Sequence, residues 1–353
     1  MNRNTFNEYL TNPNKPCYFI AEIGSNFDGD IERAYKLIEL AKEANADAVK
    51  FQHYTASSLV SDKGFKSLTN NTHQKNWSKS VFETYQDASL KKEWTKLLFN
   101  KARELEIDFL TSPYSTDLVD YVDEYIDVYK IGSGDIDYLE IIKKITTKEK
   151  PIILGCGASE WNDIDKVELI LSEKDIPRAY LQCNTNYSAS TENFKHINLK
   201  VIKNMRNRYP KAVIGLSDHT RGYATVLGAI TLGAKIIEKH FTDDNNRKGP
   251  DHKFAMNPKD WESMILESRN LENALGDGIK KIEENEKDTY LVQRRSIRVK
   301  NNLPAGHILS RVDLEVLRPQ EKGSISPNQL DTVIGKKLRK NMTSGDVITI
   351  KDL

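Results

Sequence analysis

The chain has 353 residues, which is more than one small domain needs and enough for a large buried core. Its 52 lysines and arginines balance 51 aspartates and glutamates, so the net charge of +1 gives no support for binding to nucleic acid or to a membrane surface. The polar N-terminus does not resemble a signal peptide, and no run approaches the ~20 apolar residues of a membrane span. Three widely spaced cysteines, Cys17, Cys156 and Cys183, are expected to be buried, reduced thiols of a cytoplasmic protein.

Short apolar runs alternate with longer amphipathic segments through most of the chain. Such runs, flanked by loop residues, are typical of buried strands. In the segment 31–46 between the first two runs, Ala34, Leu37, Ile38 and Ala41 fall on one face of a helix, with charged residues opposite. The expected strands span residues 17–23, 47–52, 108–112, 128–133, 151–156, 178–184, 212–217 and 235–241.

This alternation predicts an α/β fold. Strands and helices that alternate over roughly 240 residues indicate parallel strands with helices outside, and about eight repeats is the number in a (β/α)8 TIM barrel. A doubly wound open sheet is the alternative architecture. A dinucleotide-binding fold gains no support, because no GxGxxG motif follows a strand.

The sequence changes character after residue 275. Residues 276–292 are charged and include Gly276 and Gly278, as expected for a helix end and a linker. Residues 293–353 contain short β-like pieces separated by turn residues, without a long helical pattern. We therefore expect a barrel over residues 1–275, a linker over 276–292, and a small, mostly β or irregular domain over 293–353.

Polar residues stand at the ends of the expected strands, where the active site of a barrel lies. Lys50 and Lys130 are the most informative, because an ammonium group inside an apolar strand is costly unless it meets an anion. The alternative is that both lysines extend to the barrel rim and leave their charge in water. The polar strand-end residues are Glu22, Lys50, Gln52, Thr111, Ser112, Lys130, Ser133, Asn184, Thr185, Ser217, His219, Lys239 and His240.

The last two strands each end in a histidine, His219 and His240. A single histidine in this position is more often a hydrogen-bonded core residue than a ligand. The pair, with Lys239 and Asp251 close by, favours a metal-centred site in an anion-binding enzyme.

Six motifs occur in the order found in one enzyme family: AEIGSNFDGD (21–30), ADAVKFQ (46–52), KIGSGD (130–135), GLSDHT (215–220), EKHF (238–241) and GPDH (249–252). The tail, which includes LPAGHILSRVDLEVLRP (303–319), is similar to the antifreeze-like (SAF) domain of the same family. Over nearly its whole length the chain resembles the sialic acid synthases, including their legionaminic and pseudaminic acid synthase relatives. These enzymes condense phosphoenolpyruvate with a sugar to make nine-carbon keto acids.

The resemblance implies roles for individual residues. His219 and His240 match the ligands of a divalent metal, usually Mn²⁺, with Mg²⁺ or Co²⁺ as alternatives, and imidazole suits manganese better than magnesium. Glu22 and Asp251 match residues that handle protons and contact the sugar, as do Gln52 and Tyr187. Arg318 matches an arginine that one subunit inserts into the active site of the other, which implies a domain-swapped homodimer. The residues that match the phosphoenolpyruvate site are Lys50, Thr111, Lys130, Ser133, Thr185 and Ser217.

The implied reaction joins phosphoenolpyruvate, an N-acetylated aldose and water to give a keto acid and phosphate. The acceptor is expected to be N-acetylmannosamine, a 2,4-diacetamido hexose of legionaminic or pseudaminic acid synthesis, or another hexose derivative. Phe27 replaces a histidine common in the family, and Ser188 and Ser190 replace prolines. Two other hypotheses are an aldolase-type barrel that uses another keto acid, and a non-catalytic binding protein built around the tail.

Overall fold

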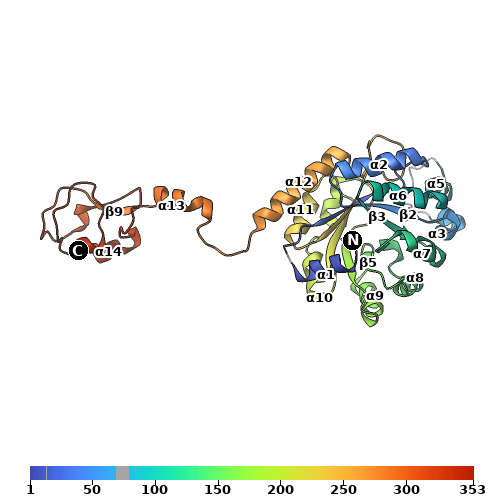
Figure 1. Ribbon diagram of the computed structural model, residues 1–353, viewed down its shortest axis with the longest axis horizontal. Coiled ribbons are helices and arrows are strands. Elements are labelled where there is room, and N and C mark those ends of the chain that lie inside the picture. Colours follow the sequence, from blue (N-terminus) through green and yellow to red (C-terminus); the bar gives the residue numbers. More distant parts are fainter. Residues whose placement is uncertain (13, 69–78) are drawn as a thin grey trace. The chain divides into compact units, whose positions relative to one another are not determined.

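The computed structural model describes residues 1–12, 14–68 and 79–353 of the chain. These residues form two compact units, Met1–Gly276 and Asp277–Leu353, whose helices and strands are shown in Figure 1. Each unit has a hydrophobic core of its own.

Eight parallel strands of the first unit close into a barrel, as predicted. Each strand pairs with the next in sequence, and β1 also pairs with β8, which excludes the open-sheet alternative. Each of the eight predicted runs coincides with one strand, although β2, β3 and β7 extend one residue beyond the predicted end. The strands are β1 (Tyr18–Glu22), β2 (Ala48–His53), β3 (Asp108–Pro113), β4 (Tyr129–Ile131), β5 (Ile152–Gly155), β6 (Arg178–Cys183), β7 (Val213–Asp218) and β8 (Ile236–His240).

Helices surround this barrel (Figure 1). In α2, the side chain of Asp30 caps the first turn, and Ala34, Leu37, Ile38 and Ala41 are buried, as the periodicity predicts. The helices that follow the strands are α2 (Ile31–Glu43), α6 (Thr95–Glu104), α7 (Thr116–Val122), α8 (Leu139–Thr146), α9 (Trp161–Glu173), α10 (Val201–Arg208), α11 (Ala224–Thr231) and α12 (Pro258–Leu275). Further helices among the described residues are α1 (Arg3–Thr11) before β1, and α3 (Ala56–Leu59), α4 (Asp62–Ser67) and α5 (Val81–Ala88) between β2 and α6.

The strands are buried on both faces. Phe19, Val49 and Phe51 belong to the large cluster under the helices, whereas Ile20 and Leu110 belong to a second cluster with the α1 residues Phe6 and Tyr9. Close strand packing also requires a glycine at position 215, since a Cβ there would lie 2.2 Å from the backbone oxygen of Ile236. The three cysteines are buried and free, as predicted.

The second unit contains a small antiparallel sheet of β9 (Ser296–Val299) and β10 (Leu314–Leu317), with the short helix α14 (Leu330–Val333). Ile297, Leu309, Val333 and Ile348 are among the residues of its core. At the end of the predicted linker, and one residue beyond it, the chain forms a further helix, α13 (Lys287–Gln293). Among all the residues that the structure describes, no helix is long and apolar enough to span a bilayer.

Candidate active site

A pocket of about 440 Å³ lies at the carboxyl ends of the barrel strands. Gln52 of β2, Ser133 after β4, Tyr187 after β6, and His240 and Asp251 at and after β8 all line it. Side chains that were predicted to act together are therefore brought to one cavity from four different strand ends.

The two predicted histidines face each other beside this pocket, with ring centroids 5.3 Å apart. His219 Nδ1 lies 2.9 Å from the backbone oxygen of Asn184, and a proton donated there leaves Nε2 as the nitrogen with a lone pair. His240 Nδ1 is buried without a hydrogen-bond partner, and Asp251 Oδ2 lies 3.8 Å from it. Tyr187 packs against the His219 ring at 4.4 Å.

Both imidazoles are held neutral. Burial lowers the pKa of His219 to about 4. Burial also lowers the pKa of His240, and the neighbouring His219 and the lysines at 50, 239 and 130 lower it further. Since metal binding requires the neutral form, the pair is ready to bind a metal at neutral pH.

These residues fit a divalent metal held by few protein ligands. A buried imidazole nitrogen without a partner is costly unless a ligand satisfies it. Within residues 1–12, 14–68 and 79–353, no group of three His, Cys, Asp or Glu side chains is placed to hold a metal. A metal bound by His219 and His240 would therefore keep open positions for water and substrate, whereas a structural metal site would be closed by protein ligands.

The two strand lysines meet at a carboxylate that the sequence analysis did not single out. Glu238 on β8 lies 3.8 Å from Lys50 Nζ and 3.3 Å from Lys130 Nζ, and it accepts a hydrogen bond of 3.0 Å from Ser217 Oγ. Although burial by itself raises the pKa of Glu238, the two ammonium groups lower it to about 2. The sequence did contain a signal for Glu238, because it is a charged residue inside the apolar run KIIEKHF. The same signal indicated Lys50.

Glu22 is the second carboxylate beside Lys50, at 2.5 Å from its Nζ. Burial raises the pKa of Glu22 to about 7 against the opposite effect of Lys50. Gln52 Nε2 donates to Glu22 Oε1 at 2.6 Å. Gly24 brings the backbone close to both carboxylates, since a Cβ at this position would lie 3.0 Å from Asp251 Oδ2 and 3.3 Å from Glu22 Oε1. Its positive φ of 54° also favours a glycine.

The predicted hydroxyl residues differ in where they lie. Ser133 Oγ accepts from the Gly157 backbone N–H at 3.0 Å, and a Cβ at Gly157 would contact both Ser133 and Thr185, so these two residues are neighbours. Thr111 does not reach the site, because its hydroxyl bonds to His53 Nδ1 at 2.6 Å and to the Phe51 backbone oxygen. Ser112 takes the inward position instead, 3.5 Å from Lys50 Nζ, because successive side chains of a strand point to opposite faces.

Two predicted features are not among the residues that line this pocket. Arg318 belongs to the second unit, just after β10, where its side chain is exposed. Phe27, the replacement for a common histidine, is buried against Phe51 and Trp94 at centroid distances of 6.4 and 6.2 Å. Its ring therefore belongs to the hydrophobic core.

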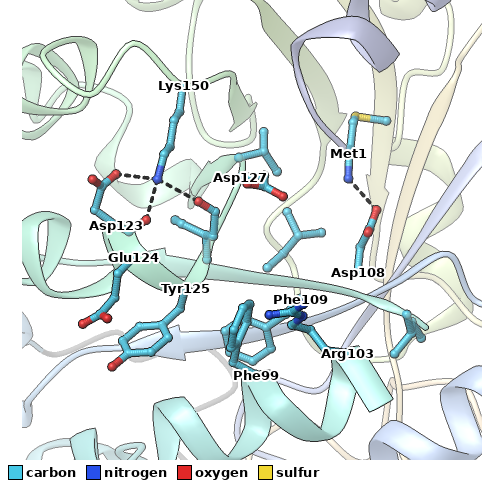
Figure 2. A pocket seen from close by; sticks show the side chains of 14 residues that line it. Met1, Phe99, Arg103, Asp108, Phe109, Asp123, Glu124, Tyr125, Asp127 and Lys150 are labelled. Carbon is cyan, nitrogen blue, oxygen red and sulfur yellow. Dashed lines mark hydrogen bonds and ion pairs between the residues drawn. The ribbon is translucent and has the colours of Figure 1, made fainter. Parts of the chain in front are cut away.

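A second pocket of about 550 Å³ lies at the amino ends of the strands, where Asp108 begins β3 and Lys150 precedes β5 (Figure 2). Four of its charged groups are engaged in ion pairs. Lys150 bonds to Asp123 and to the backbone oxygen of Ile126, and the Met1 ammonium bonds to Asp108. This end of a barrel usually contributes to stability, so the chemistry is assigned to the opposite end.

Comparisons with known proteins give matches over nearly the whole chain. The model of the NeuB family matches residues 37–280, and that of the SAF domain matches residues 294–353. The chain is 34% identical to the N,N'-diacetyllegionaminic acid synthase of Campylobacter jejuni, over 95% of its own length and 99% of the relative. It is 30% identical to a pseudaminic acid synthase of the same species, over 97% and 98% of the two chains.

Among solved structures, the protein is similar to the N-acetylneuraminic acid synthetase of Leptospira borgpetersenii. The TM-score is 0.68 at 27% identity, and the match covers 78% of this chain and 90% of that chain. The three relatives are named for three different acid products, so the similarity points to a reaction class and leaves the sugar open.

Proposed function

The chain belongs to the NeuB family and is a phosphoenolpyruvate-dependent synthase of nine-carbon sugar acids, and we propose that its acceptor is an N-acetylated aldose. N-Acetylmannosamine and the 2,4-diacetamido hexoses are the candidate acceptors. The choice of acceptor rests on the relatives. The observation that carries the reaction class is the junction of Lys50, Lys130 and Glu238 together with the neutral pair of His219 and His240.

We assign the anion site to Lys50 and Lys130, which would bind the carboxylate and phosphate of phosphoenolpyruvate. Charge-assisted hydrogen bonds from ammonium groups are among the stronger ones available in a protein, and buried ones are little screened by salt. Ser112, Ser133, Thr185 and Ser217 would add hydroxyl donors. Ser112 replaces Thr111 in this role because of the direction of its side chain.

We assign the metal site to His219 and His240, with Mn²⁺ as the preferred ion and Mg²⁺ or Co²⁺ as alternatives. A bound divalent ion would supply Lewis-acid polarisation of the aldehyde oxygen of the open-chain sugar. Tyr187 would hold the His219 ring in place, and Asp251 would orient the sugar hydroxyls near His240.

The proposed reaction begins when carbon 3 of phosphoenolpyruvate attacks the aldehyde carbon of the sugar. Water then adds to carbon 2, and phosphate leaves with cleavage of its C–O bond, so the products are the keto acid and inorganic phosphate. Glu22 would orient this water and accept its proton, and Gln52 would fix the carboxylate through Oε1. Arg318 of a partner subunit would close the sugar end of the pocket in a domain-swapped homodimer.

A product screen tests the proposal. The purified chain is incubated with phosphoenolpyruvate, Mn²⁺ and each candidate aldose, and phosphate release and the mass of the keto acid are measured. We expect phosphate release only when an acceptor aldose is present. Absence of release across N-acetylated hexoses, with the metal supplied, would refute the proposal.

The metal assignment has a test that does not use activity. His240→Gln keeps a polar side chain of similar size but removes the imidazole, so we expect the variant to stay folded and to lose stoichiometric Mn²⁺. His252→Gln is a poorer control because His252 bonds to Asp28 and Thr242 in the core, so the exposed His196→Gln is used instead. Equal manganese content in His240→Gln and His196→Gln, measured by elemental analysis, would remove His240 from the metal site.

A further inference from the structure

Two connections at the carboxyl end of the barrel are joined through the GPDH motif. One connection runs from β8 to α12 over residues 241–257 and consists mainly of turns and bends, and the other runs from β1 to α2 over residues 23–30. Asp251 of the motif lines the active-site pocket, whereas its neighbour His252 is completely buried. A buried residue next to one in the pocket can fix the position of that neighbour.

Both ring nitrogens of His252 have partners. Nε2 lies 2.9 Å from Asp28 Oδ1, and because an ionised carboxylate can only accept, the Nε2–H group is the donor. Nδ1 lies 2.7 Å from Thr242 Oγ1, near the start of the β8–α12 connection. The ring also requires a glycine at position 249, since a Cβ there would lie 2.6 Å from His252 Cδ2. The glycine and the histidine of the motif are therefore needed together.

The bond between His252 and Asp28 joins the two connections, because Asp28 belongs to residues 23–30. A second bond lies beside it, since Ser25 Oγ of the β1–α2 connection donates to Asp251 Oδ2 at 3.0 Å. Two successive residues of the motif, Asp251 and His252, are thus each bonded to the same connection. The His252 bond therefore limits the movement of the backbone that carries Asp251.

Asp28 is itself held in place from α2. Its φ of 52° is a backbone conformation that is uncommon outside glycine and persists where the surroundings hold it. Asp28 Oδ2 lies 3.2 Å from Arg33 Nε, and Arg33 also bonds to both carboxylate oxygens of Asp243, at 3.0 and 2.5 Å. The acceptor of the His252 bond is therefore fixed by a helix of the barrel.

From this geometry we propose that His252 is a positioning residue, which holds Asp251 at the sugar end of the pocket through its bond to Asp28. This role rests on the proposed function, in which Asp251 orients the hydroxyls of the aldose. His252 is not among the residues that line the pocket, so its effect passes through Asp251. Loss of the bond should weaken the use of the aldose, whereas Lys50 and Lys130, on β2 and β4, should bind phosphoenolpyruvate as before.

The test measures both substrates separately, with the full chain, Mn²⁺ and the acceptor that the wild type uses best among N-acetylmannosamine and the 2,4-diacetamido hexoses. In His252→Ala, kcat/KM for the aldose should fall about 10- to 100-fold, as is usual when a group that orients a functional residue is removed. The KM for phosphoenolpyruvate should not change. Wild-type kinetics in this variant, or an equal rise in KM for both substrates, would overturn the positioning role.

His53→Ala is the matched control. His53 is 1% exposed, and its ring nitrogens lie 2.6 Å from the hydroxyl of Thr111 and 2.7 Å from that of Thr95. This variant also removes a buried imidazole with two partners, so its melting temperature should fall while kcat/KM for the aldose stays near that of the wild type. An equal aldose-specific loss in His53→Ala would reduce the effect of His252 to general stability.

The partner of His252 gives a second pair of variants, which serves if His252→Ala does not fold. Asp28→Gly removes the acceptor at a position whose positive φ suits glycine, and it should reproduce the aldose-specific loss. Asp28→Asn keeps an acceptor oxygen and tolerates the same backbone conformation, so it should retain most of the activity. Equal kcat/KM for the aldose in Asp28→Gly and Asp28→Asn would contradict the proposal.

A double variant tests the route through Asp251. Asp251→Asn/His252→Ala should lose no more kcat/KM for the aldose than Asp251→Asn alone, because two residues that act as a unit have non-additive effects. Additive losses would show that His252 does not act through Asp251. Failure of the wild type to release phosphate with any aldose would overturn the proposed function instead, so the two failures are distinguishable.

Discussion

The most chemically informative residue is Glu22, because its burial changes when it can act as a base. Burial raises the pKa of this carboxyl to about 7, so the group is largely protonated at pH 6 and ionised at pH 8. A base must be ionised, and kcat/KM should therefore fall about tenfold per pH unit below 7 and level off above it. The pH profile of Glu22→Gln should lack this limb, whereas Glu22→Asp should keep it at a displaced pH. An unchanged limb in Glu22→Gln would assign the titration to another group.

Glu238 has a different role, because it neutralises Lys50 and Lys130 when no substrate is bound. Glu238→Gln leaves buried ammonium charge uncompensated and should lower the free energy of unfolding by about 3–5 kcal/mol. An anion can replace the missing charge, so inorganic phosphate should raise the melting temperature of this variant more than that of the wild type.

Glu168→Gln provides the matched control for this experiment. It breaks another largely buried ion pair, the one that Glu168 forms with Arg178 at 2.5 Å on the outer side of the barrel. It should lower the melting temperature without added sensitivity to phosphate. Equal phosphate shifts in Glu238→Gln and Glu168→Gln, measured by thermal melting, would show that Glu238 does not balance the anion site.

For single residues, the sequence indicated which charged side chains belong to the site, but it did not indicate which way neighbouring side chains point along a strand. Lysines and histidines in apolar runs are rare enough to indicate a site, and the structure brings Lys50, Lys130, His219 and His240 together. Thr111 was assigned to the phosphoenolpyruvate site on the resemblance. Which of two adjacent hydroxyls lies near Lys50 depends on the strand register, which a single sequence does not fix, and in the structure it is Ser112.

The barrel strands β7 and β8 hold the histidines in place through a second pair of residues behind them. Asp218 and Lys239 are register partners, and Lys239 Nζ lies 2.6 Å from Asp218 Oδ2 in a completely buried ion pair. Thr220 and Thr225 also donate to Asp218. Because side chains alternate along a strand, these residues face away from His219 and His240 and fix the separation of the two strand ends.

Lys239→Met tests this arrangement. The change leaves Asp218 charged, buried and without its ammonium partner, so unfolding should become easier by about 3–5 kcal/mol. In the double variant Asp218→Leu/Lys239→Met no buried charge remains, and most of the lost stability should return. Mn²⁺ affinity, measured by calorimetry, should remain weakened in the double variant. Full recovery of both melting temperature and affinity would show that the pair has no positioning role.

Prediction of whole elements succeeded where the pattern was long and regular. Eight apolar runs in alternation with amphipathic segments are enough to predict parallel strands covered by helices. The choice of a closed barrel over a doubly wound open sheet is decided by the pairing of β1 with β8. The helices α3, α4 and α13 were not predicted. Each is only 4–7 residues long, so the apolar periodicity has too few turns to show, and side-chain caps stabilise α4 locally.

In the molecule as a whole, the predicted catalytic residues and Arg318, a predicted sugar contact, belong to different units. The lysines, histidines and acids of the site all belong to the unit Met1–Gly276, whereas Arg318 belongs to Asp277–Leu353. The core of the second unit is made from its own residues, among them Ile297, Val333 and Ile348. An exposed arginine on a unit with its own core can serve the site of another subunit without disturbing either core.

Mixed dimers test whether Arg318 acts across subunits. His219→Ala and Arg318→Ala, each inactive alone, are co-expressed with different tags, and dimers carrying both tags are isolated. In a swapped dimer, the barrel of the Arg318→Ala chain receives Arg318 from the His219→Ala chain, so one of two sites is complete and about half of the wild-type activity should return. The control pairs His219→Ala with Lys130→Ala, where both lesions lie in the barrel and no site can be completed. Inactive mixed dimers of the first pair would show that each chain completes its own site.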